Sequence, residues 1–190
     1  MKYLSIIIPV GIIALLLLFG VSTYNGIVTK NEEATNAWAD VESSYQRRFD
    51  LIPNLVETVK GYADFEKSTL IAVTEARAAA MGAMRKAGES GDVGEFQQAN
   101  QNLGVAMGRF FGYTEQYPDL KANQNFMDLQ SQLEGTENRI NVARDRFNDA
   151  VKEYNAKIKR FPGNMFGFES KNYFEAQDGS EQAPKVDFSN

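Results

Sequence analysis

The chain has 190 residues, contains neither cysteine nor histidine, and carries a formal net charge of −5 at pH 7. The lack of cysteine excludes disulfides and thiolate chemistry, and the lack of histidine removes the commonest general base and the commonest transition-metal ligand. The negative charge argues against nucleic-acid binding, which needs a basic face. We therefore expect no metal, no cofactor and no nucleic-acid partner.

The first feature along the chain is an uncharged apolar stretch over residues 3–21, YLSIIIPVGIIALLLLFGV. As an α-helix rising about 1.5 Å per residue it would reach roughly 28 Å, close to the roughly 30 Å of hydrocarbon in a bilayer. A secretory signal peptide is the alternative, because Lys2 precedes the stretch and Gly20-Val21-Ser22 loosely fits a cleavage site. The stretch is longer than the apolar part of a signal peptide, so residues 1–22 are predicted to be a retained transmembrane anchor.

Charges beside the anchor set its expected orientation. Lys2 and the amino terminus lie on one side, and Lys30 is the first basic residue on the other. Because basic residues next to a membrane helix favour the cytoplasmic side, we expect a single-pass protein of the inner membrane. Its body is expected on the periplasmic or extracytoplasmic side.

No helix breaker follows the anchor, and a narrow stripe at three- and four-residue steps continues through Tyr24, Val28, Asn31, Thr35, Trp38, Val41 and Tyr45. The anchor and the first bundle helix are therefore predicted to form one continuous rod that ends near Asp50. Asn31 lies on the stripe, where a polar residue fixes register or partner number at a cost in stability. It is expected either to pair inside its own bundle or to take part in self-association.

A helical hairpin is predicted at Arg47, Arg48, Asp50, Pro53 and Asn54. Proline fits the first turn of a new helix, Asp50 would be its N-cap, and the two arginines would close the preceding helix. Turn chemistry accounts for this pattern, and an exposed recognition tip is the functional alternative.

The second helix is expected over residues 51–86 with a line of alanines at 72, 76 and 80, followed by a glycine-rich loop over residues 87–94. The third, over about residues 95–116, carries Gly104, Gly108 and Gly112 on one face. Each glycine costs about 1 kcal/mol relative to alanine inside a helix, so a close contact should offset them. Packing against the alanine line is expected, and a contact between subunits is the alternative.

The fourth helix has the most regular pattern in the chain. Apolar or small residues at three- and four-residue steps run from Phe126 to Tyr154, and the helix is expected to end before Phe161-Pro162-Gly163. The chain then divides into an anchor over residues 1–22, an antiparallel up-down bundle of about four long helices over residues 23–174, and an acidic flexible tail over residues 175–190. The fold class is all-α.

An up-down bundle brings the second and fourth helices back toward the membrane. The expected helix lengths place Met84, Arg85 and Lys86 at membrane level. Phe161, Phe166 and Phe168 follow the basic end of the fourth helix, a mixture typical of interfacial anchors. The alternative is that these rings cap the open end of the bundle.

No catalytic residue emerges from the sequence. Asp145 and Asp149 lie one helical turn apart and Glu32 is beside Glu33, but neither pair has a converging third group or a glycine-rich loop. Solvent-exposed helix surface explains these carboxylates, and we do not expect an enzyme.

Short segments along nearly the whole chain match one family pattern. The most specific is RRFDLIPNLVETVKGYADFE over residues 47–66, and the others are Tyr24-Asn25, Asn31, Ala37-Trp38, Ala76-Arg77, Tyr117-Pro118-Asp119-Leu120-Lys121-Ala122, Asn125-Phe126, Thr136-Glu137, Arg139-Ile140, Ala143-Arg144, Phe161-Pro162, Gly167-Phe168 and Pro184-Lys185-Val186-Asp187-Phe188. On these residues the chain resembles the LemA family. It departs modestly, with Phe147 where relatives often carry tyrosine and Tyr45-Gln46 for the more usual leucine-lysine.

The resemblance implies an antiparallel bundle of long helices behind one membrane helix, a role in membrane organisation, and no catalytic residues to carry over. It also implies a membrane-bound zinc metalloprotease as a candidate partner, since relatives are often encoded beside one. Two functions follow as hypotheses: a self-associating scaffold that organises or remodels the bilayer, and an adaptor for a membrane protease or another membrane partner.

Overall fold

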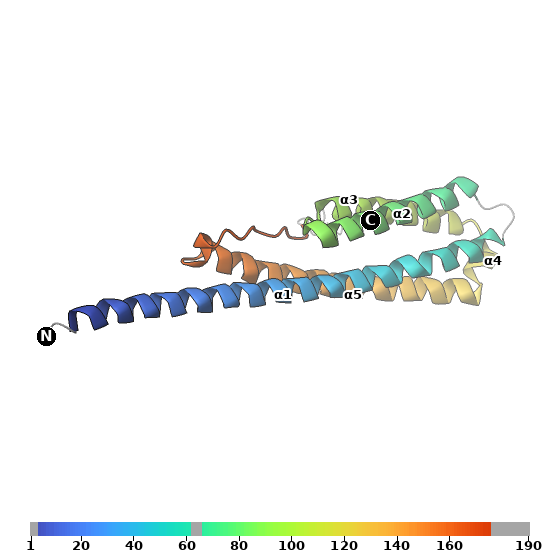
Figure 1. Ribbon diagram of the computed structural model, residues 1–190. Helices are drawn as coiled ribbons and strands as arrows, with labels where there is room; N and C mark the ends of the chain where they lie inside the picture. Colours follow the sequence, from blue (N-terminus) through green and yellow to red (C-terminus); the bar gives the residue numbers. More distant parts are fainter. Residues whose placement is uncertain (1–3, 62–65, 176–190) are drawn as a thin grey trace, which may run out of the picture.

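The computed structural model describes residues 4–61 and 66–175. Its helices are α1 (Leu4–Lys60), α2 (Lys67–Ser90), α3 (Gly94–Thr114), the single turn α4 (Pro118–Lys121) and α5 (Gln124–Lys159), followed by the 3-10 turn η1 (Gly163–Met165). The four long helices run alternately away from and back toward the amino-terminal end (Figure 1). The described residues contain no strand, so the predicted all-α, up-down bundle is confirmed.

Helix α1 is one uninterrupted element of 57 residues, roughly 85 Å long. Its beginning projects beyond every other described element (Figure 1). Each large apolar side chain between Ile7 and Val21 is more than half exposed. The continuous rod predicted from the sequence is therefore present, and its first turns have no protein partner within the described chain.

The bundle has two layers. Helices α1 and α5 lie side by side along most of their length, and α2 and α3 form a second antiparallel pair on the far half of α1 (Figure 1). The core between the layers is aromatic, and Tyr45, Phe49, Phe96, Phe110 and Phe126 are among its largest fully buried side chains. A part-buried ion pair between Arg48 and Glu137, 2.6 Å long, also joins α1 to α5.

The predicted hairpin at Asp50 and Pro53 is wrong, because α1 continues through Pro53 to Lys60. Proline has no N–H, so the carbonyl of Phe49 loses its usual partner four residues on. Arg77 of α2 replaces that partner, since its Nε donates to the Phe49 oxygen at 2.6 Å. The apolar pattern also continues past the proline, and Leu51, Ile52, Leu55, Val56 and Val59 are all buried.

Because α1 ends at Lys60 and not near Asp50, α2 begins later than predicted and has only 24 residues. The helix ends at Ser90 and is capped by Gly91, which has a positive φ of 73°. Near this end, a Cβ at Gly88 would lie 3.0 Å from Nε1 of Trp38. Trp38 is 16 residues beyond Ser22, roughly 24 Å along α1. The helix lengths therefore do not bring the end of α2 to the membrane, in contrast to the prediction.

The three glycines of α3 do not pack against the alanines of α2, which corrects that expectation. A Cβ added at Gly104, Gly108 or Gly112 would have nothing within 4 Å, apart from the helix's own backbone. Helix α3 instead points Leu103 and Phe110 into the core. The glycine line is an exposed face of the bundle.

Candidate functional site

The candidate site is the end of the bundle beside the apolar start of α1, where α1, the end of α5 and η1 meet (Figure 1). A small cluster of Ile27, Tyr154 and Ile158 is buried there, with Phe168 packed against it. Gly163 allows the close approach: a Cβ at this position would collide with the carbonyl oxygen of Lys157 and lie 3.3 Å from Cδ1 of Ile27. The chain after α5 is therefore held tightly against α1.

The aromatic residues predicted at the membrane interface divide into two groups. Phe166 and Phe168 pack on Tyr24 of α1, with ring centroids 5.7 Å and 5.6 Å away. Phe161 and Met165 project outward and are 76% and 73% exposed. One part of the segment thus caps the bundle, and the other presents large apolar side chains next to the anchor.

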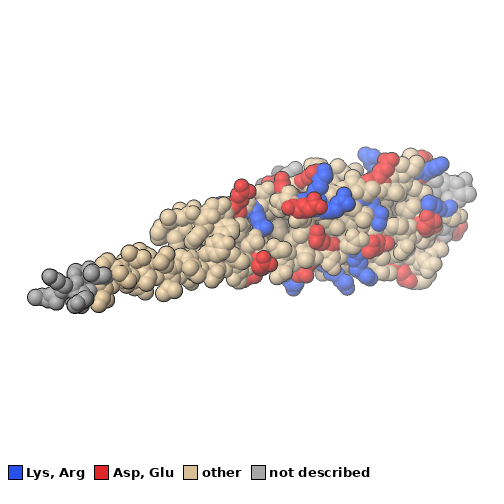
Figure 2. All heavy atoms as spheres, in the orientation of Figure 1, with Lys and Arg blue, Asp and Glu red and all other residues tan. Residues whose placement is uncertain are grey.

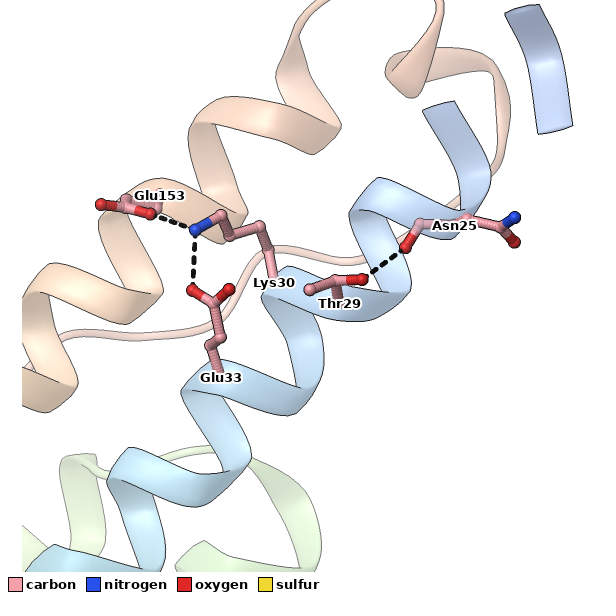
Figure 3. Close-up of polar contacts among 5 residues, drawn as sticks. All are labelled: Asn25, Thr29, Lys30, Glu33 and Glu153. Atoms are coloured by element: carbon pink, nitrogen blue, oxygen red, sulfur yellow. Dashed lines mark hydrogen bonds and ion pairs between the residues drawn. The ribbon is translucent and has the colours of Figure 1, made fainter. Parts of the chain in front are cut away.

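Lys30 joins α1 to α5 at this end (Figure 3). Its Nζ donates to carboxylates of Glu153 at 2.6 Å and Glu33 at 2.7 Å. The hydrogen bond to Glu153, followed by that to Glu33, raises the pKa of Lys30, and the same contact lowers the pKa of Glu153. On the outer side of α1 the hydroxyl of Thr29 donates to the carbonyl of Asn25 at 3.0 Å (Figure 3).

Residues 169–175, which we call the strap, run in extended form back along α5 and are held by side-chain amides. Asn155 donates to the carbonyl of Lys171 at 2.8 Å and accepts from its N–H at 3.0 Å. Asn148 makes the same pair of bonds with Phe174, both 2.9 Å long. Each amide therefore satisfies both backbone groups of one strap residue, as a neighbouring strand would.

The end of the strap is fixed in the core. Gln97 of α3 pairs with both backbone groups of Glu175, at 3.2 Å and 3.0 Å. The buried ring of Phe174 lies 6.1 Å from Trp38 and 5.5 Å from Phe147, and the guanidinium of Arg144 lies 4.8 Å from its centroid. The strap thus links α5 to α3 and adds the ring of Phe174 to the core.

The sequence pattern pointed to rings that cap the bundle, but not to the amides that hold the strap. Asn148 and Asn155 each directly follow an aromatic residue of the α5 stripe and are one heptad apart. That repeat at the edge of a core face was the available signal. Most of the predicted tail, residues 176–190, lies outside the described residues.

The remaining predicted residues lie elsewhere. Met84 is buried in the core, Arg85 is exposed, and Lys86 forms an exposed ion pair with Glu95 at 2.8 Å. Asn31 is half-buried and lies on the apolar line of Ile27, Ala34 and Trp38, four residues after Ile27 and three before Ala34. The other hairpin residues, Arg47, Asp50 and Asn54, are exposed at the end of α1 far from the anchor, where Asp50 accepts from Gln46 at 2.7 Å.

Within residues 7–61 and 66–175, no group of three or more acidic side chains is placed to hold a metal ion. Asp145 and Asp149 are exposed on α5.

One helix in the described part of the chain is long and apolar enough to cross a membrane, and it is α1. The 18-residue window that qualifies it has a mean hydropathy of 2.3, and none of that window is buried. In Figure 2 the corresponding described stretch carries no charged side chain, and charged side chains begin only on the body. The start of α1 therefore fits a membrane anchor.

A model of the LemA family matches residues 37–188. Magnetosome protein MamQ 2 of Paramagnetospirillum magneticum is 27% identical, over 94% of this chain and 72% of its own length. Magnetosome protein MamQ of Magnetospirillum gryphiswaldense is 25% identical over 83% and 66%, and Protein LemA of Metamycoplasma hominis is 23% identical over 72% and 60%. Because the family model covers most of the chain, this membrane-associated helical protein belongs to the LemA family.

Proposed function

We propose that the protein is a single-pass membrane scaffold whose helical body self-associates and thereby organises or remodels the bilayer. The observation that carries the proposal is the continuity of α1 from the apolar segment into the core, without a break at residue 22 or at Pro53. A rigid connection means that bundles packed side by side would fix the spacing and tilt of their membrane helices. A flexible linker would not transmit that geometry.

The glycine line on α3 supports a contact between subunits. Gly104, Gly108 and Gly112 have open space around them, and neighbouring Val105 is 58% exposed. Three interior helix glycines cost about 1 kcal/mol each relative to alanine. Close approach of a second copy would offset that cost, because it lets two helix backbones pack tightly.

The proposal also covers the membrane in which the protein lies and the side that its body faces. The inner membrane, with the body on the periplasmic or extracytoplasmic side, follows from the charges beside the anchor. The similarity to magnetosome proteins supports a role at a membrane. The variant Asn36→Cys would report on which side of the membrane the body lies, since the chain has no cysteine of its own. A membrane-impermeant thiol reagent is expected to label this cysteine in intact cells. Labelling only after lysis would contradict the proposed orientation.

Self-association is tested by adding bulk to the glycine line. Gly108→Leu should dissociate the assembly of the full chain in detergent, measured by native mass spectrometry. Gly135→Leu is the matched control, because Gly135 is also exposed in a long helix with nothing within 4 Å of a Cβ. An assembly that survives Gly108→Leu would remove the glycine line as the interface.

An adaptor for a membrane-bound metalloprotease or another membrane protein is the second candidate. A groove of about 620 Å³ between α2 and α3 favours it, lined by small residues that include Ala72, Ala76 and Ala79 and by Arg109. Such a surface suits a partner helix. A photocrosslinker on Ala76→Cys should then trap one discrete membrane protein in cells, whereas adducts only with a second copy would favour the scaffold.

A further inference from the structure

A second groove, of about 770 Å³, lies between α1 and the end of α5 at the anchor end of the bundle. Phe19, within the apolar segment itself, lines it together with Thr23, while Phe161 and Pro162 form part of the opposite wall. The groove therefore begins at the depth where the apolar stretch of α1 ends. In a membrane this is the level of the lipid headgroups.

The groove has an excess of positive charge. Four basic side chains line it, Lys30, Lys152, Lys157 and Arg160, against two acidic ones, Asp149 and Glu153. Glu153 is already bound by Lys30. Lys152, Lys157 and Arg160 form no ion pair with any residue that the structure describes, although the chain as a whole is acidic. An unpaired basic cluster of this kind attracts an anion.

The position of Lys157 depends on a glycine in the facing helix. Its Nζ lies against Gly26 of α1, where a Cβ would collide with that nitrogen and lie 2.8 Å from Cε. The lysine is half-buried, while Arg160 one turn further along α5 is exposed. Glycine at residue 26 thus lets Lys157 lie between α1 and α5, where it lines the groove.

From this arrangement we infer that the groove binds an anionic phospholipid. Lys157 and Arg160 donate charge-assisted hydrogen bonds to the lipid phosphate, and the rings of Phe19 and Phe161 contact the upper part of its acyl chains. The inference rests on the membrane anchoring in the proposed function and is independent of self-association. Bound lipid would tie α5 as well as α1 to the bilayer.

The test counts lipids retained by the full chain in detergent, by native mass spectrometry, after addition of phosphatidylglycerol or phosphatidylcholine. Wild type is expected to retain phosphatidylglycerol preferentially. Lys157→Gln combined with Arg160→Gln should weaken that binding roughly tenfold to thirtyfold, since each basic residue contributes a separate favourable interaction with the headgroup. The matched control is Lys67→Gln with Arg139→Gln, which removes two exposed charges outside the groove and should leave binding unchanged.

A third variant separates a built groove from general surface charge. Gly26→Leu keeps every charge but fills the space that Lys157 occupies, so it too should lower lipid retention. Unchanged retention in Gly26→Leu or in the double glutamine variant, or equal retention of phosphatidylcholine, would overturn the inference. Displacement of the lipid by inorganic phosphate would instead identify a site for free phosphate. The oligomeric mass of each variant, read in the same spectra, reports on self-association separately.

Discussion

Arg77 donates from Nε to the carbonyl oxygen of Phe49 at 2.6 Å, which is the backbone acceptor that Pro53 leaves without a partner inside α1. The arginine comes from α2, so the bond also ties the second helix to the first. It lets α1 pass a proline without ending. The rigid rod of the proposed function depends on this replacement.

Replacing the arginine tests that role directly. Arg77→Ala should lower the free energy of unfolding by about 1–3 kcal/mol, because a part-buried carbonyl loses its donor. In a Pro53→Ala background the same change should cost less, because alanine at residue 53 restores the N–H that bonds Phe49. Thermal unfolding of wild type, the two single variants and the double variant, followed by circular dichroism, gives the coupling free energy between residues 53 and 77. Equal costs in the two backgrounds would show that Arg77 does not compensate the proline.

The strap provides a second prediction. Asn155→Ala removes both bonds to the backbone of Lys171. Hydrogen exchange of the amides in residues 169–175 should become roughly fivefold faster, which corresponds to about 1 kcal/mol of lost local stability. Asn141→Ala, an exposed asparagine of the same helix, is the control and should leave the strap unchanged. Unaltered exchange in Asn155→Ala would mean that the bonds from Asn155 do not hold the strap in place.

The pair of Lys30 and Glu153 predicts a pH dependence. The pKa of Glu153 is lowered, so its stabilising effect is present above the ordinary value of 4.5 and is lost as the pH falls through the lower folded-state pKa. The pKa of Lys30 is raised, so its effect is complete below 10.5 and is lost as the pH rises through the higher folded-state pKa. The difference in melting temperature between wild type and Glu153→Gln should therefore be largest between these limits.

That difference should shrink at both ends of the pH range, and a difference independent of pH would show that the ion pair does not stabilise the fold. Glu33→Gln serves for comparison, because it leaves the bond between Lys30 and Glu153 in place. Both carboxylates are largely solvent-exposed, so the effect should also weaken with added salt.

Much of the fold was predictable from the spacing of apolar residues alone. The stripe of α5 is an example: Phe126, Leu133, Ile140, Phe147 and Tyr154 are all buried, as their heptad steps predict. The continuity of the anchor with the first bundle helix follows in the same way from the absence of a breaker. In a long helix the spacing of apolar residues repeats over many turns, so a short stretch of sequence is enough to predict the helix and its buried face.

The errors arose where a distant residue decides the local outcome. Pro53 reads as a helix start, but a donor from Arg77 in another helix overrides that local rule. The repeat of Asn148 and Asn155 marks two amides at the edge of the core, but it does not reveal what they bind, because their partners are backbone groups that any residue has. For the glycine line, the expected monomer contact is absent and the three positions are open.

Self-association of the membrane-anchored body is tested most directly by the mass of the assembled particle. Native mass spectrometry of the full chain, released from detergent micelles, should show one defined multiple of the 21.2 kDa protomer. The same multiple should persist on dilution, since a scaffold must hold its subunits in a fixed arrangement. A spectrum of single protomers at every protein concentration would contradict the proposed scaffold.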